Sequence, residues 1–215
     1  MADARFQSLD ELVQVMAAVS TRPSLWVGWS MGGMAVLRLA ELYPQLLSSA
    51  LLVATNPCFV TRPDWSSAVE ASVFEQFASD LERHQEKTLR RFLALQVRGT
   101  EDAMSLLRQL QISLKSQGSA SPEALKRGLD ILVQTDLRQS LAGIDTPLHW
   151  LLGEKDALVP ASLAGALKQD YHQKNVVVQE QAGHAPFLSH AEAFVRQLLA
   201  VAEPLRQATT AGYAI

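Results

Sequence analysis

A serine, an acid and a histidine occur along this chain in settings that suit acyl-transfer chemistry. Ser30 stands at the centre of a G-x-S-x-G pattern at residues 28–32. An apolar, strand-like run at 25–29 precedes it, and a helical pattern at 34–43 follows. A tight turn between a strand and a helix exposes a serine hydroxyl at its tip, so the pattern predicts that Ser30 is a nucleophile. Three glycines are expected to keep side chains out of this turn: Gly28, Gly32 and Gly33.

A serine hydroxyl is a weak nucleophile near neutral pH and needs a base that a carboxylate orients. Asp156 lies in a G-x-x-D-x-x-V-P loop after a predicted strand at 148–152, and His184 lies in a Gly-His pair after another at 176–178. Asp156 is favoured over Glu154 because that loop resembles the acid loop of α/β-hydrolases.

The order Ser30, Asp156, His184 is also that of α/β-hydrolases, which predicts nucleophile, acid and base respectively. The backbone N–H of Met31, at the start of the helix after the serine, is an expected oxyanion donor.

Strand-like and helix-like segments alternate before residue 64 and again after residue 137, which indicates an α/β fold with a mostly parallel sheet. Between them the pattern consists of amphipathic helices broken at Gly99, Gly118 and Ser121-Pro122. We therefore expect an α/β-hydrolase core at 1–63 and 138–206, a helical cap insertion at 64–137 and a loose tail at 207–215.

Composition excludes several other classes. The chain has 215 residues, with 22 acidic against 19 basic side chains and no run of five like charges, so no nucleic-acid partner is expected. No apolar run approaches the roughly 20 residues that span a bilayer, and residues 1–6 do not resemble a secretory signal. With the single Cys58, this favours a reducing, cytoplasmic setting. No Cys, His or carboxylate cluster has metal-ligand spacing, so we expect no metal and no cofactor. We also expect no membrane contact and a monomer.

From about residue 6 to 207 the chain resembles the pimeloyl-acyl-carrier-protein methyl ester esterases of biotin synthesis. The segments that carry the resemblance are Trp26 to Gly33, Asn56 to Phe59, Arg91 to Gln96, Thr135 to Arg138 and His184 to Phe187. The resemblance implies an acyl pocket lined by Phe92, Leu93, Ala94, Leu95 and Gln96. It also implies that basic cap residues attract an acidic acyl-carrier protein, here Lys87, Arg91 and Arg108. Lys87 and Met104 stand where that family often has arginine, so a weaker basic patch is expected.

The chain departs from the usual fold before Ser30. Only residues 1–24 precede the first predicted strand, and they contain no His-Gly loop. We therefore expect about fifty residues of the usual fold to be missing. These residues would include the N-terminal strands and the second N–H that binds the oxyanion. The favoured interpretation is a serine carboxylesterase acting on the methyl ester of a carrier-bound pimeloyl chain. Two alternatives stay open: a general short-chain carboxylesterase, and an inactive truncated remnant that binds carrier protein through its cap.

Overall fold

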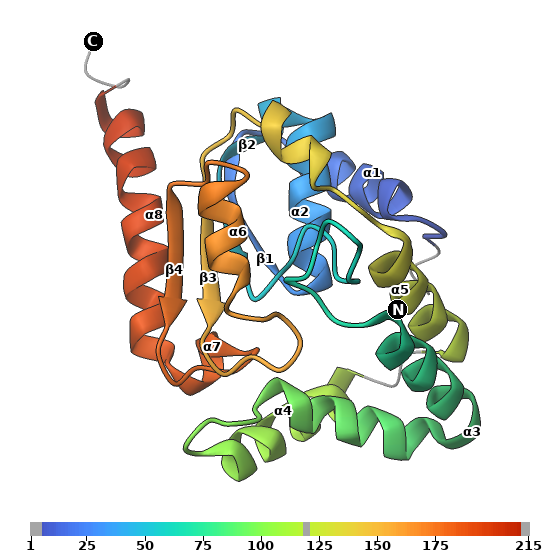
Figure 1. Ribbon diagram of the computed structural model, residues 1–215. Coiled ribbons are helices and arrows are strands. Elements are labelled where there is room, and N and C mark those ends of the chain that lie inside the picture. Colours follow the sequence, from blue (N-terminus) through green and yellow to red (C-terminus); the bar gives the residue numbers. More distant parts are fainter. Residues whose placement is uncertain (1–5, 118–120, 212–215) are drawn as a thin grey trace.

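A parallel β-sheet forms the centre of the molecule, and it confirms the predicted α/β class (Figure 1). The computed structural model describes residues 6–117 and 121–211. Within them the sheet has the strand order β1-β2-β3-β4, and each pair of neighbours is parallel. The strands are β1 (Ser24–Trp29), β2 (Leu47–Val53), β3 (Leu148–Gly153) and β4 (Asn175–Gln179).

Helices cover both faces of this sheet. On one face α2 contacts β1 and β2, α1 packs on α2, and α6 contacts β4; on the other face α8 contacts β2 and adjoins α7. Two short 3₁₀ helices, η1 and η2, precede β2 and β3. The bounds are α1 (Leu9–Val19), α2 (Met31–Leu42), η1 (Pro44–Leu46), η2 (Gln139–Gly143), α6 (Leu163–Gln169), α7 (Pro186–Ser189) and α8 (Ala191–Ala211).

The second half of strand β2, residues 50–53, shows why its sequence is an unbroken apolar run. Successive side chains of a strand point to opposite faces, so Leu52 joins the core beneath α1 and α2 while Leu51 and Val53 pack with Val201 of α8. All of these side chains are buried because helices cover both faces. Strand β1 has only β2 as a partner among the described strands, and its Val27 side chain is 45% exposed.

Three helices between β2 and β3 occupy the place of the expected cap: α3 (Ala71–Gln96), α4 (Ala103–Gln117) and α5 (Pro122–Gln134). Figure 1 shows α4 beyond the end of the sheet to which the β3 and β4 arrows point. Helix α3 bends sharply at His84, whose φ of −145° and ψ of 56° are not helical. The bend brings Phe77 and Phe92 to a ring separation of 5.3 Å, and nothing in the sequence pattern predicted it.

The predicted loose tail needs a correction. Helix α8 continues to Ala211, so the prediction was wrong for residues 207–211, while 212–215 lie outside the described residues. The predicted break at Gly118 also lies outside them. The division into core and cap at residues 64 and 137 stays a proposal. Over residues 6–117 and 121–211, no helix is long and apolar enough to cross a membrane.

Candidate active site

Ser30 forms the turn between β1 and α2, and its backbone is strained. Its φ of 54° lies in the left-handed region, which costs a residue with a side chain about 1–3 kcal/mol. Neighbouring groups hold this conformation. The Ser30 N–H donates to the Val53 carbonyl at 3.0 Å, and the Ser30 carbonyl accepts from the Gly33 N–H at 2.9 Å and the Thr55 hydroxyl at 2.7 Å. Strand β2 and its following loop therefore brace the predicted nucleophile from both sides.

The glycines around the turn do not share one role. A Cβ atom on Gly28 would lie 2.6 Å from the Gly32 carbonyl oxygen and from the Gly33 Cα, and one on Gly33 would lie 2.5 Å from the Thr55 Cβ. A Cβ on Gly32 would meet nothing within 4 Å. The expectation that a side chain would collide therefore holds at Gly28 and Gly33 and is wrong at Gly32.

Asp156 and His184 form a buried pair at the carboxyl ends of β3 and β4. Asp156 Oδ2 lies 2.8 Å from His184 Nδ1, and both side chains are fully buried. The other carboxylate oxygen, Oδ1, accepts the N–H groups of Leu158 at 2.8 Å and Val159 at 3.0 Å. A carboxylate can only accept, so Nδ1 carries the imidazole proton and Nε2 is left as a proton acceptor. The tautomer is the one that a general base requires.

Glu154, the other acidic residue of this loop, has a different place. Its carboxylate accepts the Gln181 N–H at 2.8 Å, and the Lys155 N–H donates to the Ala182 carbonyl at 2.8 Å. These bonds fasten the loop after β3 to the loop after β4. Glu154 thus helps to hold the two loops that carry Asp156 and His184 and is not itself paired with the histidine.

The Ser30 hydroxyl and His184 are not hydrogen-bonded to each other here. His184 Nε2 is buried and has no partner among the described residues. Trp29, next to Ser30, donates its Nε1–H to the His184 carbonyl at 2.7 Å, and its ring lies 5.6 Å from the imidazole. The turn and the histidine loop therefore meet through Trp29. Catalytic hydrogen bonds of this kind commonly tighten only when a substrate is bound.

The cap reaches this site at two points. A Cβ on Gly128 of α5 would lie 3.7 Å from the Met31 sulfur, so α5 lies over the start of α2 and the expected oxyanion donor. A Cβ on Gly183 would lie 3.3 Å from the Gln96 carbonyl, so the end of α3 lies against the histidine loop.

The predicted acyl-pocket segment is the last part of α3. Gln96 is 2% exposed, and its Nε2 donates to the Phe92 carbonyl at 3.3 Å while its Oε1 has no described partner. The side chains of Phe92, Leu93, Ala94 and Leu95 are half-buried. A free buried acceptor beside half-buried apolar groups fits a segment that faces a ligand, but the lining role stays a prediction.

The three predicted docking residues are exposed on the cap, where Lys87 and Arg91 lie on α3 and Arg108 on α4. Arg91 pairs with Asp80 at 3.3 Å across the bend, which cancels part of its charge. Neither Lys87 nor Arg108 has an ion pair with any residue that the structure describes. The docking role stays a prediction.

The sequence predicted no role in the site for Trp29 or Thr55, yet both hold groups of the site. Trp29 lies inside the G-x-S-x-G pattern, and Thr55 follows the buried run of β2, so their positions next to catalytic segments were the available signal. No group of three or more His, Cys, Asp or Glu side chains among the described residues could hold a metal ion.

Comparison with known proteins places this geometry in a family. Residues 5–191 match the family described as alpha/beta hydrolase fold. The chain belongs to the α/β-hydrolase family. The esterase from Exiguobacterium antarcticum has this fold with a TM-score of 0.82 at 20% identity, over 93% of this chain and 75% of the esterase. A bromoperoxidase from Bacillus anthracis gives a TM-score of 0.80 at 20% identity, over 94% and 77%. The predicted fold class is confirmed.

Curated α/β-hydrolase relatives confirm the resemblance given by the sequence segments. A protein of Xylella fastidiosa (strain M12), named pimeloyl-(acyl-carrier protein) methyl ester esterase, is 41% identical over 186 residues, which cover 86% of this chain and 72% of the relative. A protein of the same name from Pectobacterium carotovorum subsp. carotovorum (strain PC1) is 37% identical over 196 residues, covering 91% and 76%.

Proposed function

We propose that this protein is a serine carboxylesterase that hydrolyses the methyl ester of a pimeloyl chain carried by an acyl-carrier protein. The observation that carries the proposal is the buried Asp156–His184 pair, whose free Nε2 is the base that the strained Ser30 needs. The names of the curated relatives support the substrate, because those proteins are named for that ester.

The acylation step follows from the positions of the groups. Ser30 Oγ attacks the ester carbonyl carbon while His184 Nε2 takes the hydroxyl proton. The carbonyl oxygen becomes negatively charged and is stabilised by the Met31 N–H and the positive end of α2. The bond to the methoxy oxygen then breaks, and the imidazolium returns the proton so that methanol leaves. The pimeloyl chain remains as an ester on Ser30.

Deacylation uses the same groups in reverse. His184 Nε2 takes a proton from a water molecule, whose oxygen attacks the acyl carbon. The bond to Ser30 Oγ breaks, and the proton passes from the imidazolium to the serine. The carrier-bound chain leaves with a free carboxyl group. Asp156 stays ionised throughout and stabilises the imidazolium that forms in each half of the reaction.

The carrier protein would contact the exposed basic residues of the cap, with the acyl chain running inward along residues 92–96. Both Lys87 and Arg108 are unpaired among the described residues and can attract an acidic partner. We place this reaction in the cytoplasm.

One observation favours a second candidate, a general short-chain carboxylesterase. The Arg91–Asp80 pair reduces the positive charge of the cap and so weakens its attraction for an acidic carrier protein. The two candidates share the chemistry at Ser30 and differ in whether the carrier contributes to binding.

Burst kinetics test the shared chemistry. The purified chain should release a stoichiometric burst of p-nitrophenol from p-nitrophenyl butyrate, because the leaving group departs when Ser30 is acylated. Ser30→Ala should abolish the burst, while Ser105→Ala, an exposed serine on α4, should leave it unchanged. A folded chain that releases no p-nitrophenol in a Ser30-dependent way, in the burst or in the steady state, would refute the esterase proposal and favour the inactive remnant.

A charge reversal distinguishes the two candidates. Methanol release is measured from pimeloyl methyl ester on an acyl-carrier protein and from free dimethyl pimelate. In the carrier proposal, Lys87→Glu with Arg108→Glu raises KM for the carrier-bound ester only. Arg196→Glu on α8 is the control, since it changes the same kind of charge on another helix. Equal KM values for the carrier ester in all variants would favour the general esterase.

A further inference from the structure

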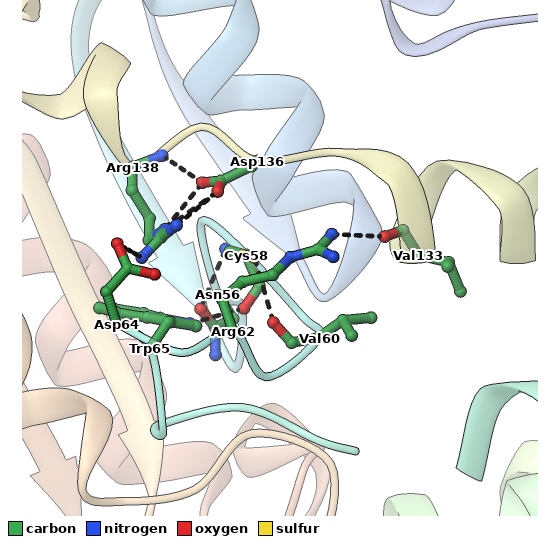
Figure 2. Close-up of polar contacts among 9 residues, drawn as sticks. All are labelled: Asn56, Cys58, Val60, Arg62, Asp64, Trp65, Val133, Asp136 and Arg138. Atoms are coloured by element: carbon green, nitrogen blue, oxygen red, sulfur yellow. Dashed lines mark hydrogen bonds and ion pairs between the residues drawn. The ribbon is translucent and has the colours of Figure 1, made fainter. Parts of the chain in front are cut away.

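Two stretches of chain connect the cap helices to the sheet, and they lie against each other. The inlet segment, residues 57–69, lies between β2 and α3. The outlet segment, residues 133–138, comprises the last two residues of α5 and the chain that follows it towards β3. The Leu137 N–H donates to the Pro57 carbonyl at 2.9 Å. The guanidinium of Arg62 donates to the Val133 carbonyl at 3.2 Å. The two connections of the cap are therefore bonded to each other, and Figure 2 shows the bond between Arg62 and Val133.

Arg138 binds a carboxylate of each segment. Its guanidinium forms hydrogen bonds of 2.7 to 3.1 Å with Asp136 of the outlet segment and an ion pair of 3.0 Å with Asp64 of the inlet segment. Figure 2 shows it between the two carboxylates. Arg138 is only 12% exposed, whereas Asp64 is 74% exposed. The planar guanidinium can serve both carboxylates at once, which a lysine ammonium could not do with the same geometry.

An aromatic ring supports this guanidinium. The Arg138 Cζ lies 5.4 Å from the centroid of the Trp65 ring, a cation–π distance. Trp65 is 3% exposed, donates its Nε1–H to the Cys58 carbonyl at 2.8 Å and meets Tyr171 edge-on at 5.9 Å. The charged side chain thus rests on a ring that is itself anchored in the core.

The two residues just before the inlet segment connect it to the nucleophile. Asn56 is fully buried, donates to the Ser67 carbonyl at 2.7 Å and accepts the Cys58 N–H at 3.1 Å. It follows Thr55, whose hydroxyl holds the Ser30 carbonyl. Thr55, which braces the nucleophile, is therefore followed directly by Asn56 and Pro57, which bond to the inlet and outlet segments respectively.

We propose that four residues form a clasp that holds the cap in a fixed position over the nucleophile: Arg138, Asp136, Asp64 and Trp65. The clasp thereby determines which acyl chains are accepted. Arg138 is a positioning residue, because it acts through the placement of α3 and α5 and not on the reacting atoms. The inference deepens the proposed esterase function and rests on it. A small ester needs only the serine turn and the base, whereas a long acyl chain also needs the cap face at 92–96.

Hydrogen–deuterium exchange of the full chain tests the clasp without requiring activity. Arg138→Ala should speed backbone exchange in α3 and α5 and leave the amides of β1 to β4 unchanged. Arg138→Lys should restore part of the protection, because it keeps the charge but loses the two-carboxylate geometry. Arg196→Ala, which removes a surface arginine paired with Glu192, is the matched control and should change neither region.

Kinetics with two esters test the effect on acyl chains. Arg138→Ala should raise KM for p-nitrophenyl octanoate on the order of tenfold, while kcat for p-nitrophenyl acetate stays within about twofold of the wild type. If Arg138→Ala does not fold, Asp64→Asn removes only the exposed arm of the clasp. It should give smaller changes in the same directions.

Failure of the clasp proposal can be distinguished from failure of the esterase proposal. Unchanged cap exchange in Arg138→Ala, or faster exchange spread over the whole sheet, would overturn the clasp. Equal losses of kcat/KM for the octanoyl and acetyl esters would also overturn it. Such losses would show that the substitution destabilises the whole protein and does not act on the acyl chain. An inactive wild type with a normal exchange pattern would refute the esterase proposal alone.

Discussion

Gly28→Ala and Gly32→Ala should have opposite effects on stability, although both residues belong to the G-x-S-x-G pattern. The Gly28 Cβ would lie 2.6 Å from the Gly32 carbonyl oxygen and from the Gly33 Cα, and these backbone atoms cannot move aside by changing rotamer. Such overpacking costs about 1–3 kcal/mol. In a chain of this size 1 kcal/mol shifts the melting temperature by about 2–4 °C, so Gly28→Ala should melt about 2–12 °C lower.

Gly32→Ala meets open space and lies in the first turn of α2, where alanine is favoured over glycine by about 0.5–1 kcal/mol. It should melt about 1–4 °C higher than the wild type. Thermal denaturation followed by circular dichroism measures both variants side by side. A drop for Gly32→Ala as large as that for Gly28→Ala would show that the described backbone of the serine turn is wrong.

Three further outcomes are expected. Asp156→Asn should lower kcat for p-nitrophenyl butyrate on the order of 10⁴-fold, since an amide can donate to Nδ1 and reverse the His184 tautomer. Circular dichroism should show a normal fold, and a near-normal kcat would exclude Asp156 as the acid. Trp29→Phe should keep the ring contacts but leave the His184 carbonyl unpaired. The free energy of unfolding, measured by urea titration, should fall by about 1 kcal/mol. An unchanged free energy of unfolding would mean that this hydrogen bond contributes nothing to stability. Burial lowers the pKa of His149, so the unfolded chain takes up a proton at higher pH than the folded protein. The free energy of unfolding should therefore fall as pH drops through the unfolded value of 6.5, and His149→Gln should flatten that fall; an identical pH profile would contradict it.

The sequence predicted the serine turn well because its constraints are local. A strand, a turn and a helix that adjoin in the chain must also adjoin in space, so the G-x-S-x-G pattern at 28–32 predicted the position of Ser30 between β1 and α2. The parallel sheet was predictable because a short continuous apolar run, such as that at 50–53, is typical of a strand covered on both faces. Loops after parallel strands meet at one edge, which brought Asp156 and His184 together as expected.

Other features depend on contacts between residues far apart in the chain, and only the tertiary structure decided them. The need for glycine at 28 but not at 32 follows from how the backbone of α2 passes β1, which the motif does not encode. The bend at His84 is accompanied by a contact between Phe77 and Phe92, and helical periodicity carries no information about it. The clasp joins Asp64 to Arg138 across the whole cap. A charged residue in a sequence does not show which distant partner it meets, because packing of the intervening helices makes that choice.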